Sequence, residues 1–347
     1  MATSRISSIA ASAAVFALAF IPAQAQVVQP IAGPVLGFSV DRSAGIRPIL
    51  GIAGAATLGQ PVISDTGLEG VTLAPARDYA LALLASGREV VLVKNLRATA
   101  GASVLDVAPG PARIAISPSG DAAVLFYDET ARVQVLSGLP ESPAVLWSLD
   151  LSGLSGSPAA LAVSDGGGAV LVAPAGEPAS VWLATPDVGQ RFLYSVAGSP
   201  SLTFLVGSLD AAIADGTAGA VVLVRDPAGQ PQVTQIGGQA EGVSHPVAIA
   251  AAQDNTRIFV ANAQPAGVVS LNLTGEDPAM QPCACTPTGL ERMAGGAAFR
   301  LNEAGGGPIW VLDTSGARMR VVFVPEQMQL LRDTGRAPTP RRGGSDR

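Results

Sequence analysis

Residues 110–127 read Gly110-Pro-Ala-Arg-Ile-Ala-Ile-Ser-Pro-Ser-Gly120-Asp-Ala-Ala-Val-Leu-Phe-Tyr127, which is an apolar run, a polar turn and a second apolar run. Proline and glycine fall between the apolar runs, as they do in turns that join strands. The same shape recurs at residues 68–84, 157–172, 199–214, 245–260 and 288–312. The spacing of roughly 42–46 residues is typical of a four-stranded propeller blade. The repeat therefore predicts an all-β fold, a β-propeller.

A further, partial copy precedes these six. Residues 33–41 resemble residues 307–313, and we interpret both as the second strand of a blade, with residues 46–52 as a third strand. This copy brings the count to seven four-stranded blades. Six blades remain the alternative, because the first copy is incomplete.

The last copy ends after a third strand, at Val324-Pro325. Its missing outer strand is expected from the N-terminal segment, near residues 27–31. A ring closed by the N-terminal strand would have no open edge between its first and last blades.

The N-terminus has the three parts of a secretory signal peptide. A short basic start precedes an apolar run at residues 9–21, and Ala23-Gln24-Ala25 is a small-x-small cleavage sequence. The apolar run is too short for a membrane anchor. We expect residues 1–25 to be removed near Ala25-Gln26, which predicts a secreted or periplasmic protein without a transmembrane segment in the mature chain.

The rest of the chain divides into two parts. Residues 26–330 carry the repeats and are predicted to form a single propeller domain. Residues 331–347 are basic, rich in proline and glycine and without apolar periodicity, which predicts a disordered tail. The net charge of −6 argues against nucleic acid as a partner, since nucleic-acid binding needs a basic stripe. We expect a monomer that binds a protein or a small molecule.

The repeat resembles that of the YVTN/NHL-type propeller families. Residues 111–127 with 132–136 give the clearest match, and residues 245–262 with 267–271 the next, including Phe259-Val-Ala-Asn262. The resemblance spans nearly the whole mature chain, through loose motifs, and implies an exported member of bacterial type. It implies the fold and says little about function, because propellers include both binding modules and enzymes.

Enzymatic propellers usually work at the mouth of the central channel, on loops that enter the inner strands. Five polar residues are expected at that position and are the candidate binding residues: Glu69, Arg113, His245, Glu291 and Arg292. They include no cluster of carboxylates such as a calcium-dependent lactonase would use. A lone histidine lacks the partners that a catalytic or metal site needs, and no Gly-x-Ser-x-Gly elbow is present. We therefore predict no cofactor, no metal and no catalytic residue.

The two cysteines are Cys283 and Cys285. Export would place them in an oxidising compartment, where we expect a local disulfide. A redox or metal role and a pair of free or intermolecularly linked thiols are the alternatives, because bridges over one residue are strained and zinc needs about four ligands.

The leading hypothesis for function is a binding or interaction scaffold that acts through its loop faces. It follows from coherent repeats without an assembled catalytic set. The alternative is a hydrolase or lactonase-like enzyme with its site at the channel mouth.

Overall fold

The computed structural model describes residues 33–41, 45–63, 67–154, 157–293, 295–302 and 308–325. Blade by blade from the axis outward, the strands are β1 (Val35–Asp41), β2 (Gly45–Ile52), β3 (Ala55–Leu58); β4 (Leu68–Leu73), β5 (Tyr79–Leu84), β6 (Val90–Lys94), β7 (Gly101–Val104); β8 (Arg113–Ile116), β9 (Ala122–Tyr127), β10 (Arg132–Ser137), β11 (Ala144–Asp150); β12 (Pro158–Val163), β13 (Val170–Pro174), β14 (Ala179–Thr185), β15 (Gly189–Val196); β16 (Pro200–Phe204), β17 (Ala211–Asp215), β18 (Ala220–Arg225), β19 (Gln232–Gly237); β20 (Pro246–Ala251), β21 (Arg257–Asn262), β22 (Gly267–Asn272), β23 (Ala279–Pro282); β24 (Glu291–Arg292), β25 (Ala298–Arg300), β26 (Ile309–Asp313), β27 (Arg320–Val324). The helices within these residues are single 3-10 turns, η1 (Asp128–Thr130), η2 (Asp165–Gly167) and η3 (Gln239–Glu241).

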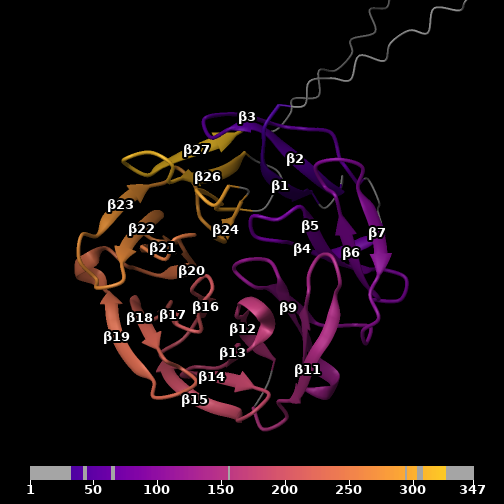
Figure 1. Ribbon diagram of the computed structural model, residues 1–347. Helices are drawn as coiled ribbons and strands as arrows, with labels where there is room; N and C mark the ends of the chain where they lie inside the picture. Colours follow the sequence, from indigo (N-terminus) through magenta and orange to yellow (C-terminus); the bar gives the residue numbers. More distant parts are fainter. Residues whose placement is uncertain are drawn as a thin grey trace, which may run out of the picture. The chain divides into compact units, whose positions relative to one another are not determined.

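These strands form seven antiparallel blades arranged in a ring, which confirms the predicted seven-bladed β-propeller (Figure 1). The six-bladed alternative is wrong. Six sheets have four strands each, and the first sheet has three within the described residues. In each sheet the strands are neighbours in the order in which the chain makes them, so that every connection is a hairpin.

The strand assignments in the first and last blades correct the sequence interpretation. β1 is the innermost strand of its blade rather than a second strand, and β26 is the third strand of the seventh blade. β27 is then the fourth, so the seventh blade is complete from its own segment. An outer strand from the N-terminus is not needed to complete it, and residues 27–31 lie outside the described part. The strands of one repeat are alike in length and apolar content, so the pattern hid a shift of one strand.

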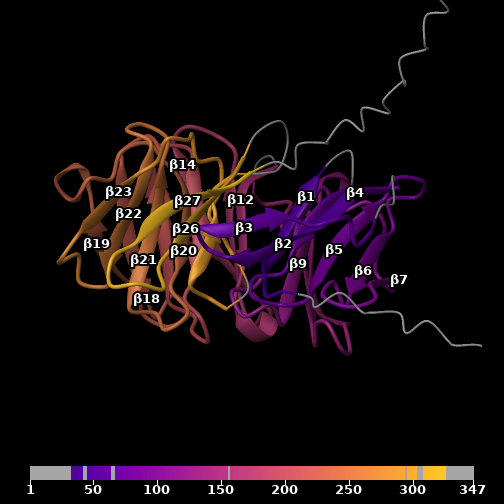
Figure 2. The same ribbon diagram turned by 90° about the horizontal axis from the view of Figure 1, so that it is seen from above.

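The predicted signal peptide (residues 1–25) and C-terminal tail (residues 331–347) also lie outside the described residues. At the junction of the first and seventh blades, β3 lies beside β27 in both views (Figures 1 and 2). Ile49 and Leu58 of the first blade pack there with Ile309 and Val324 of the seventh. Among the described residues, side-chain packing therefore closes the ring.

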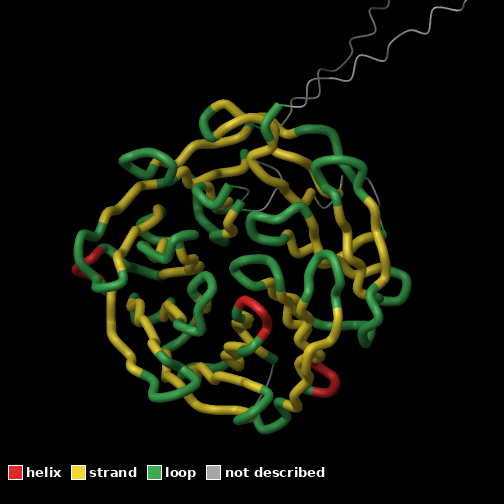
Figure 3. The backbone as a smooth tube through the Cα atoms, in the orientation of Figure 1, coloured by secondary structure: helices red, strands yellow, loops and turns green. Residues whose placement is uncertain are grey.

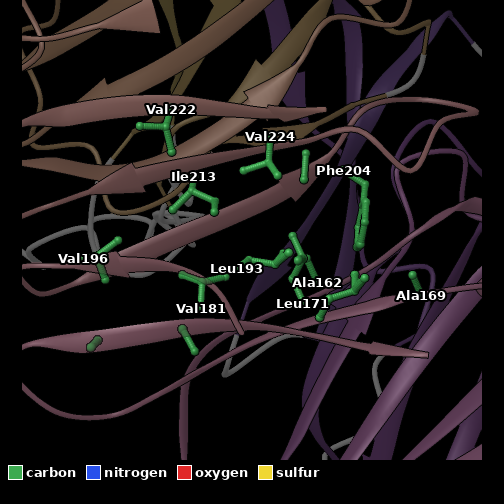
Figure 4. Close-up of a cluster of buried hydrophobic side chains, with 14 residues drawn as sticks. Ala162, Ala169, Leu171, Val181, Leu193, Val196, Phe204, Ile213, Val222 and Val224 are labelled. Atoms are coloured by element: carbon green, nitrogen blue, oxygen red, sulfur yellow. The ribbon is translucent and has the colours of Figure 1, made fainter. Parts of the chain in front are cut away.

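The hydrophobic core lies between blades. Within the described residues it divides into seven apolar clusters, one for each pair of neighbouring blades. Figure 4 shows the cluster in which Leu171 and Val181 of the fourth blade meet Phe204 and Ile213 of the fifth. Full burial of a side chain of this size contributes about 1.5–3 kcal/mol. Every blade therefore needs apolar side chains on both of its faces, which accounts for the 48% hydrophobic composition.

Candidate binding site at the axis of the ring

The turns between the first and second strands of six blades share one hydrogen bond. The residue after the inner strand donates its N–H to the carbonyl five residues later, at 2.8–3.0 Å. The pairs are Ala74–Tyr79, Ser117–Ala122, Ser164–Ala169, Leu205–Asp210, Ala252–Arg257 and Met293–Ala298. This bond gives all six blades a common register. The turns extend toward the centre of the ring, where the red helix nearest the axis is η2 (Figure 3).

Hydrogen bonds also join these turns from blade to blade. The Asp165 carboxylate accepts from the backbone N–H of Ser119 in the third blade (2.7 Å) and of Gly207 in the fifth (2.6 Å). Asn255 of the sixth blade exchanges two bonds with the backbone of Val206, at 2.9 and 2.7 Å. The turns thus form a connected structure around the axis rather than independent loops.

The β8–β9 turn accepts side-chain donors at three successive carbonyls. Arg292 of the seventh blade, 174 residues later in the chain, donates through Nη2 to the carbonyl of Pro118. Arg77 donates through Nε to Ser119 at 2.7 Å, and the hydroxyl of Tyr79 donates to Gly120 at 2.9 Å. Two guanidinium groups from different blades are therefore attached to neighbouring carbonyls of one turn.

These groups line a cavity of about 220 Å³ at the axis. Residues of the inner strand of every blade contribute to it, and most of them are small or apolar, as in ordinary ligand pockets. The charged lining residues within the described chain are Arg77, Glu291, Arg292 and Arg300.

The seventh blade is the source of most of this charge. In the common register, Arg292 occupies the place held in the other five aligned blades by Leu73, Ile116, Val163, Phe204 and Ala251. Arg300 occupies the place of Leu81, Val124, Leu171, Ala212 and Phe259. Two arginines thus stand where the fold elsewhere uses apolar residues.

Arg292 is a buried cation, with 8% of its surface exposed. Its Nη1 donates to Oε1 of Gln253 at 2.8 Å, while Nε has no hydrogen-bond partner among the described residues. Burial lowers the pKa of Arg292, and the negative charge of Asp165 opposes that effect. Burial also raises the pKa of Tyr79.

Arg300 is also buried and is paired. Its Nη2 forms an ion pair with Glu291, and its Nη1 lies 3.5 Å from the hydroxyl of Ser39 in the first blade. The Glu291 side chain is 56% exposed, whereas that of Arg300 is 5% exposed, so the pair links a buried residue to a solvent-accessible one. The pair neutralises both charges locally.

The structure brings two of the five predicted residues together. Glu291 and Arg292 are neighbours on β24 and line the cavity. Glu69, Arg113 and His245 lie at the entering ends of the inner strands and are not part of the cavity lining. Arg113 donates instead to the carbonyl of Ala159 in the fourth blade at 3.2 Å, and Nδ1 of His245 lies 3.1 Å from the Ser244 hydroxyl.

Sequence reasoning did not identify Arg77, Arg300 and Asp165. It searched the loops that enter the inner strands, whereas Arg77 and Asp165 belong to turns that leave them. Arg300 had a usable signal, because a charged residue interrupts an apolar strand of the repeat. Aligning the copies on the turn, rather than on the start of the inner strand, exposes that interruption.

Cys283 and Cys285 follow β23, in the connection between the sixth and seventh blades. Their sulfur atoms are adjacent, and their Cα atoms are 5.0 Å apart, within the range of disulfides. The arrangement is compatible with the expected bridge.

Two features are absent from the described residues. Within them, no group of three or more histidine, cysteine, aspartate or glutamate residues is placed to hold a metal ion. No helix in this part of the chain has the length and apolar character needed to cross a bilayer.

Comparison with known proteins supports the fold alone. No protein-family model matches the sequence, and no curated protein matches it. A functionally unknown protein from Desulfotomaculum acetoxidans DSM 771 is similar in structure, with a TM-score of 0.58 and 11% identity over 84% of this chain and 100% of that one. The structure of U3-55K is similar with a TM-score of 0.50 and 11% identity, over 75% of this chain and 82% of that one. The fold therefore defines the class, a seven-bladed β-propeller. The comparisons do not show membership of the YVTN/NHL families.

Proposed function

We propose that this chain is an exported binding protein that uses the propeller as a rigid scaffold and holds a ligand in the axial cavity. The cavity itself carries the proposal. It combines largely apolar walls with a few fixed charged groups, which is the usual make-up of a small-molecule site. The inter-blade hydrogen bonds of Asp165 and Asn255 fix the turns that surround it, and such preorganisation favours binding.

Filling the cavity tests this proposal. Ala115 and Thr203 line the cavity on different blades, so Ala115→Trp and Thr203→Trp should each occupy it. Ala102→Trp, on the exposed outer strand β7, is the matched control. Purified chain is screened for thermal stabilisation by a chemically mixed library of small molecules. Compounds that stabilise the parent and the Ala102→Trp protein should not stabilise either cavity variant. Compounds that stabilise all four proteins equally would contradict an axial site.

Export is part of the proposal and rests on the sequence of residues 1–25. Intact mass of the protein recovered from the medium or periplasm of an expressing bacterium should correspond to a chain that begins at Gln26. Full-length protein confined to the cytoplasm would contradict this expectation.

In the exported protein we expect Cys283 and Cys285 to be bonded to each other. Alkylation without reductant should leave the mass unchanged, and alkylation after reduction should add two groups, one for each cysteine. Two alkylated thiols before reduction would refute the bridge.

No observation in the described residues favours the hydrolase or lactonase alternative, so we do not propose it.

A further inference from the structure

The charge of the axial cavity differs in sign from that of the whole protein. The chain has a net charge of −6, yet the charged cavity residues are three arginines and one glutamate. Glu291 neutralises Arg300 through their ion pair. Asp165 is the negative group that acts on Arg292. Asp121 of the β8–β9 turn acts on Tyr79 in the same way. Within the described residues, Arg77 and Arg292 are then the lining cations without a carboxylate in hydrogen-bond contact.

Arg292 is buried without a carboxylate partner within hydrogen-bond distance among the described residues. Its terminal nitrogens donate to a side-chain amide and a backbone carbonyl, which are neutral acceptors, and its Nε donates to nothing in that part of the chain. A buried charge that lacks an opposite charge, and a buried donor without an acceptor, both cost free energy. An anion in the cavity would relieve the first cost and could relieve the second.

Arg77 supplies the second donor group. It uses Nε to hold the carbonyl of Ser119, and within the described residues its two terminal nitrogens have no hydrogen-bond partner. The neighbouring carbonyl, that of Pro118, holds Arg292. One turn therefore fixes two guanidinium groups side by side at the cavity, with donors left over for a ligand.

The repeat does not require a charge at the position of Arg292. Five other blades place apolar residues at the position of Arg292, and all contribute to the same ring. Replacement of buried charges by apolar residues is often neutral or stabilising. The packing of the ring therefore does not by itself account for an arginine at this position.

The rest of the lining indicates what the anion carries. Ile116, Leu202, Ile249 and Leu290 provide apolar walls from four blades. The volume of about 220 Å³ is below the roughly 300–1,000 Å³ of pockets for drug-sized ligands. A compact apolar body with one carboxylate matches the walls and the volume, and a guanidinium fork matches carboxylate geometry.

We infer that the axial cavity binds a small organic monocarboxylate, with its carboxylate between Arg77 and Arg292 and its apolar part against the inner strands. The inference rests on the proposed binding function and names its ligand class.

The test uses the purified chain and two carboxylates, benzoate and 2-methylpropanoate, each compared with its neutral amide. Isothermal titration calorimetry should show each acid binding at least about tenfold more tightly than its amide. Inorganic phosphate, an anion without an apolar body, should bind more weakly than benzoate. Equal binding of acids and amides, tighter binding of phosphate, or no binding of either acid would overturn the inference.

Variants connect the binding to the two arginines. Arg292→Leu should weaken binding of benzoate at least about tenfold, and Arg77→Gln at least about threefold. Arg191→Gln is the matched control, because Arg191 also donates to backbone carbonyls but lies on the outer strand β15. Unchanged affinity in Arg77→Gln would overturn the inference, and this exposed position keeps the test decisive if Arg292→Leu does not fold.

The two proposals fail in different ways. Suppose that neutral library compounds stabilise the parent but not the cavity variants, and that neither acid binds. The axial binding site would then stand, and the monocarboxylate ligand class would be refuted. Compounds that bind regardless of cavity filling would refute the axial site itself.

Discussion

The third and seventh blades have the same topology and the same turn hydrogen bond, but they differ in what they place near the axis. In the third blade, all six residues of β9 are buried and none is charged. In the seventh blade, the corresponding strand ends with Arg300, and the inner strand consists of Glu291 and Arg292. One blade is a regular member of the repeat, while the other carries most of the charge of the cavity.

The two blades are also complementary. The third blade offers the turn whose carbonyls accept donors, and the seventh blade supplies Arg292, one of those donors. The comparison teaches that apolar packing between regular blades maintains the ring, and that a site arises where one blade departs from the pattern. Four substitutions test this division, in order of decreasing expected effect.

The largest effect is expected when the charge of the seventh blade is copied into the third. Val124 is fully buried and has the same register as Arg300. Its cross-strand partner is Ala115, whereas that of Arg300 is Glu291, with which it forms an ion pair. Val124→Arg should therefore cost about 4 kcal/mol or more, or prevent folding. Urea unfolding measures the loss, with Val124→Ile as control. A loss below about 1 kcal/mol would show that the regular blades tolerate charge.

Asp165 tests whether the turns act as one structure. Asp165→Ala removes the acceptor shared by Ser119 and Gly207 and should lower the free energy of unfolding by about 1–3 kcal/mol. Asp226→Ala is the matched control, because Asp226 accepts from Gly229 and Gln230 within its own outer turn. Equal losses in the two variants would mean that links between blades add nothing.

Asp121 should make the stability of the third blade depend on pH. The seventh blade has no such carboxylate, since it has Ala297 at this turn position. Burial raises the pKa of Asp121, but hydrogen bonds from Gly166 and Ser117 outweigh it and hold the pKa below its usual value. A lowered pKa adds stability above the unfolded value near about 3.9, which is lost as the pH falls through the folded value.

Asp121→Asn should therefore be less stable than the parent by about 1 kcal/mol at neutral pH. The difference should shrink as the pH falls below about 4. Unfolding curves at neutral and acidic pH measure it, and a difference that does not depend on pH would contradict the role of the carboxylate.

The smallest effect is expected when the seventh blade is made regular. Arg300→Leu introduces the residue that the second and fourth blades have in this register. The half-exposed Glu291 left behind can be solvated, so the free energy of unfolding should change by less than about 1 kcal/mol. Urea unfolding compares the variant with the parent. A loss above about 3 kcal/mol would show that the ion pair is needed for the fold.

Sequence reasoning predicted the seven blades because each blade repeats the same apolar runs and turns. It misplaced strands in the first and last blades, since neighbouring strands of a repeat have similar patterns. For the site it named Glu291 and Arg292 but expected them where the chain enters the inner strands, whereas the common register places Arg292 where the chain leaves them. Arg77, Asp165 and Arg300 were missed. Their importance depends on contacts between residues far apart in the sequence, such as Arg77 with Ser119 over 42 residues and Arg300 with Ser39 over 261.

The sequence by itself determined the kind of fold, because strand length, apolar alternation and turn residues are local properties that recur along the chain. Only the tertiary structure decided where the charges meet. Closing the ring brings the seventh blade against the axis opposite the turn of the third. There the buried guanidinium of Arg292 is held by neutral acceptors, and this arrangement makes the axial cavity a site for an anion.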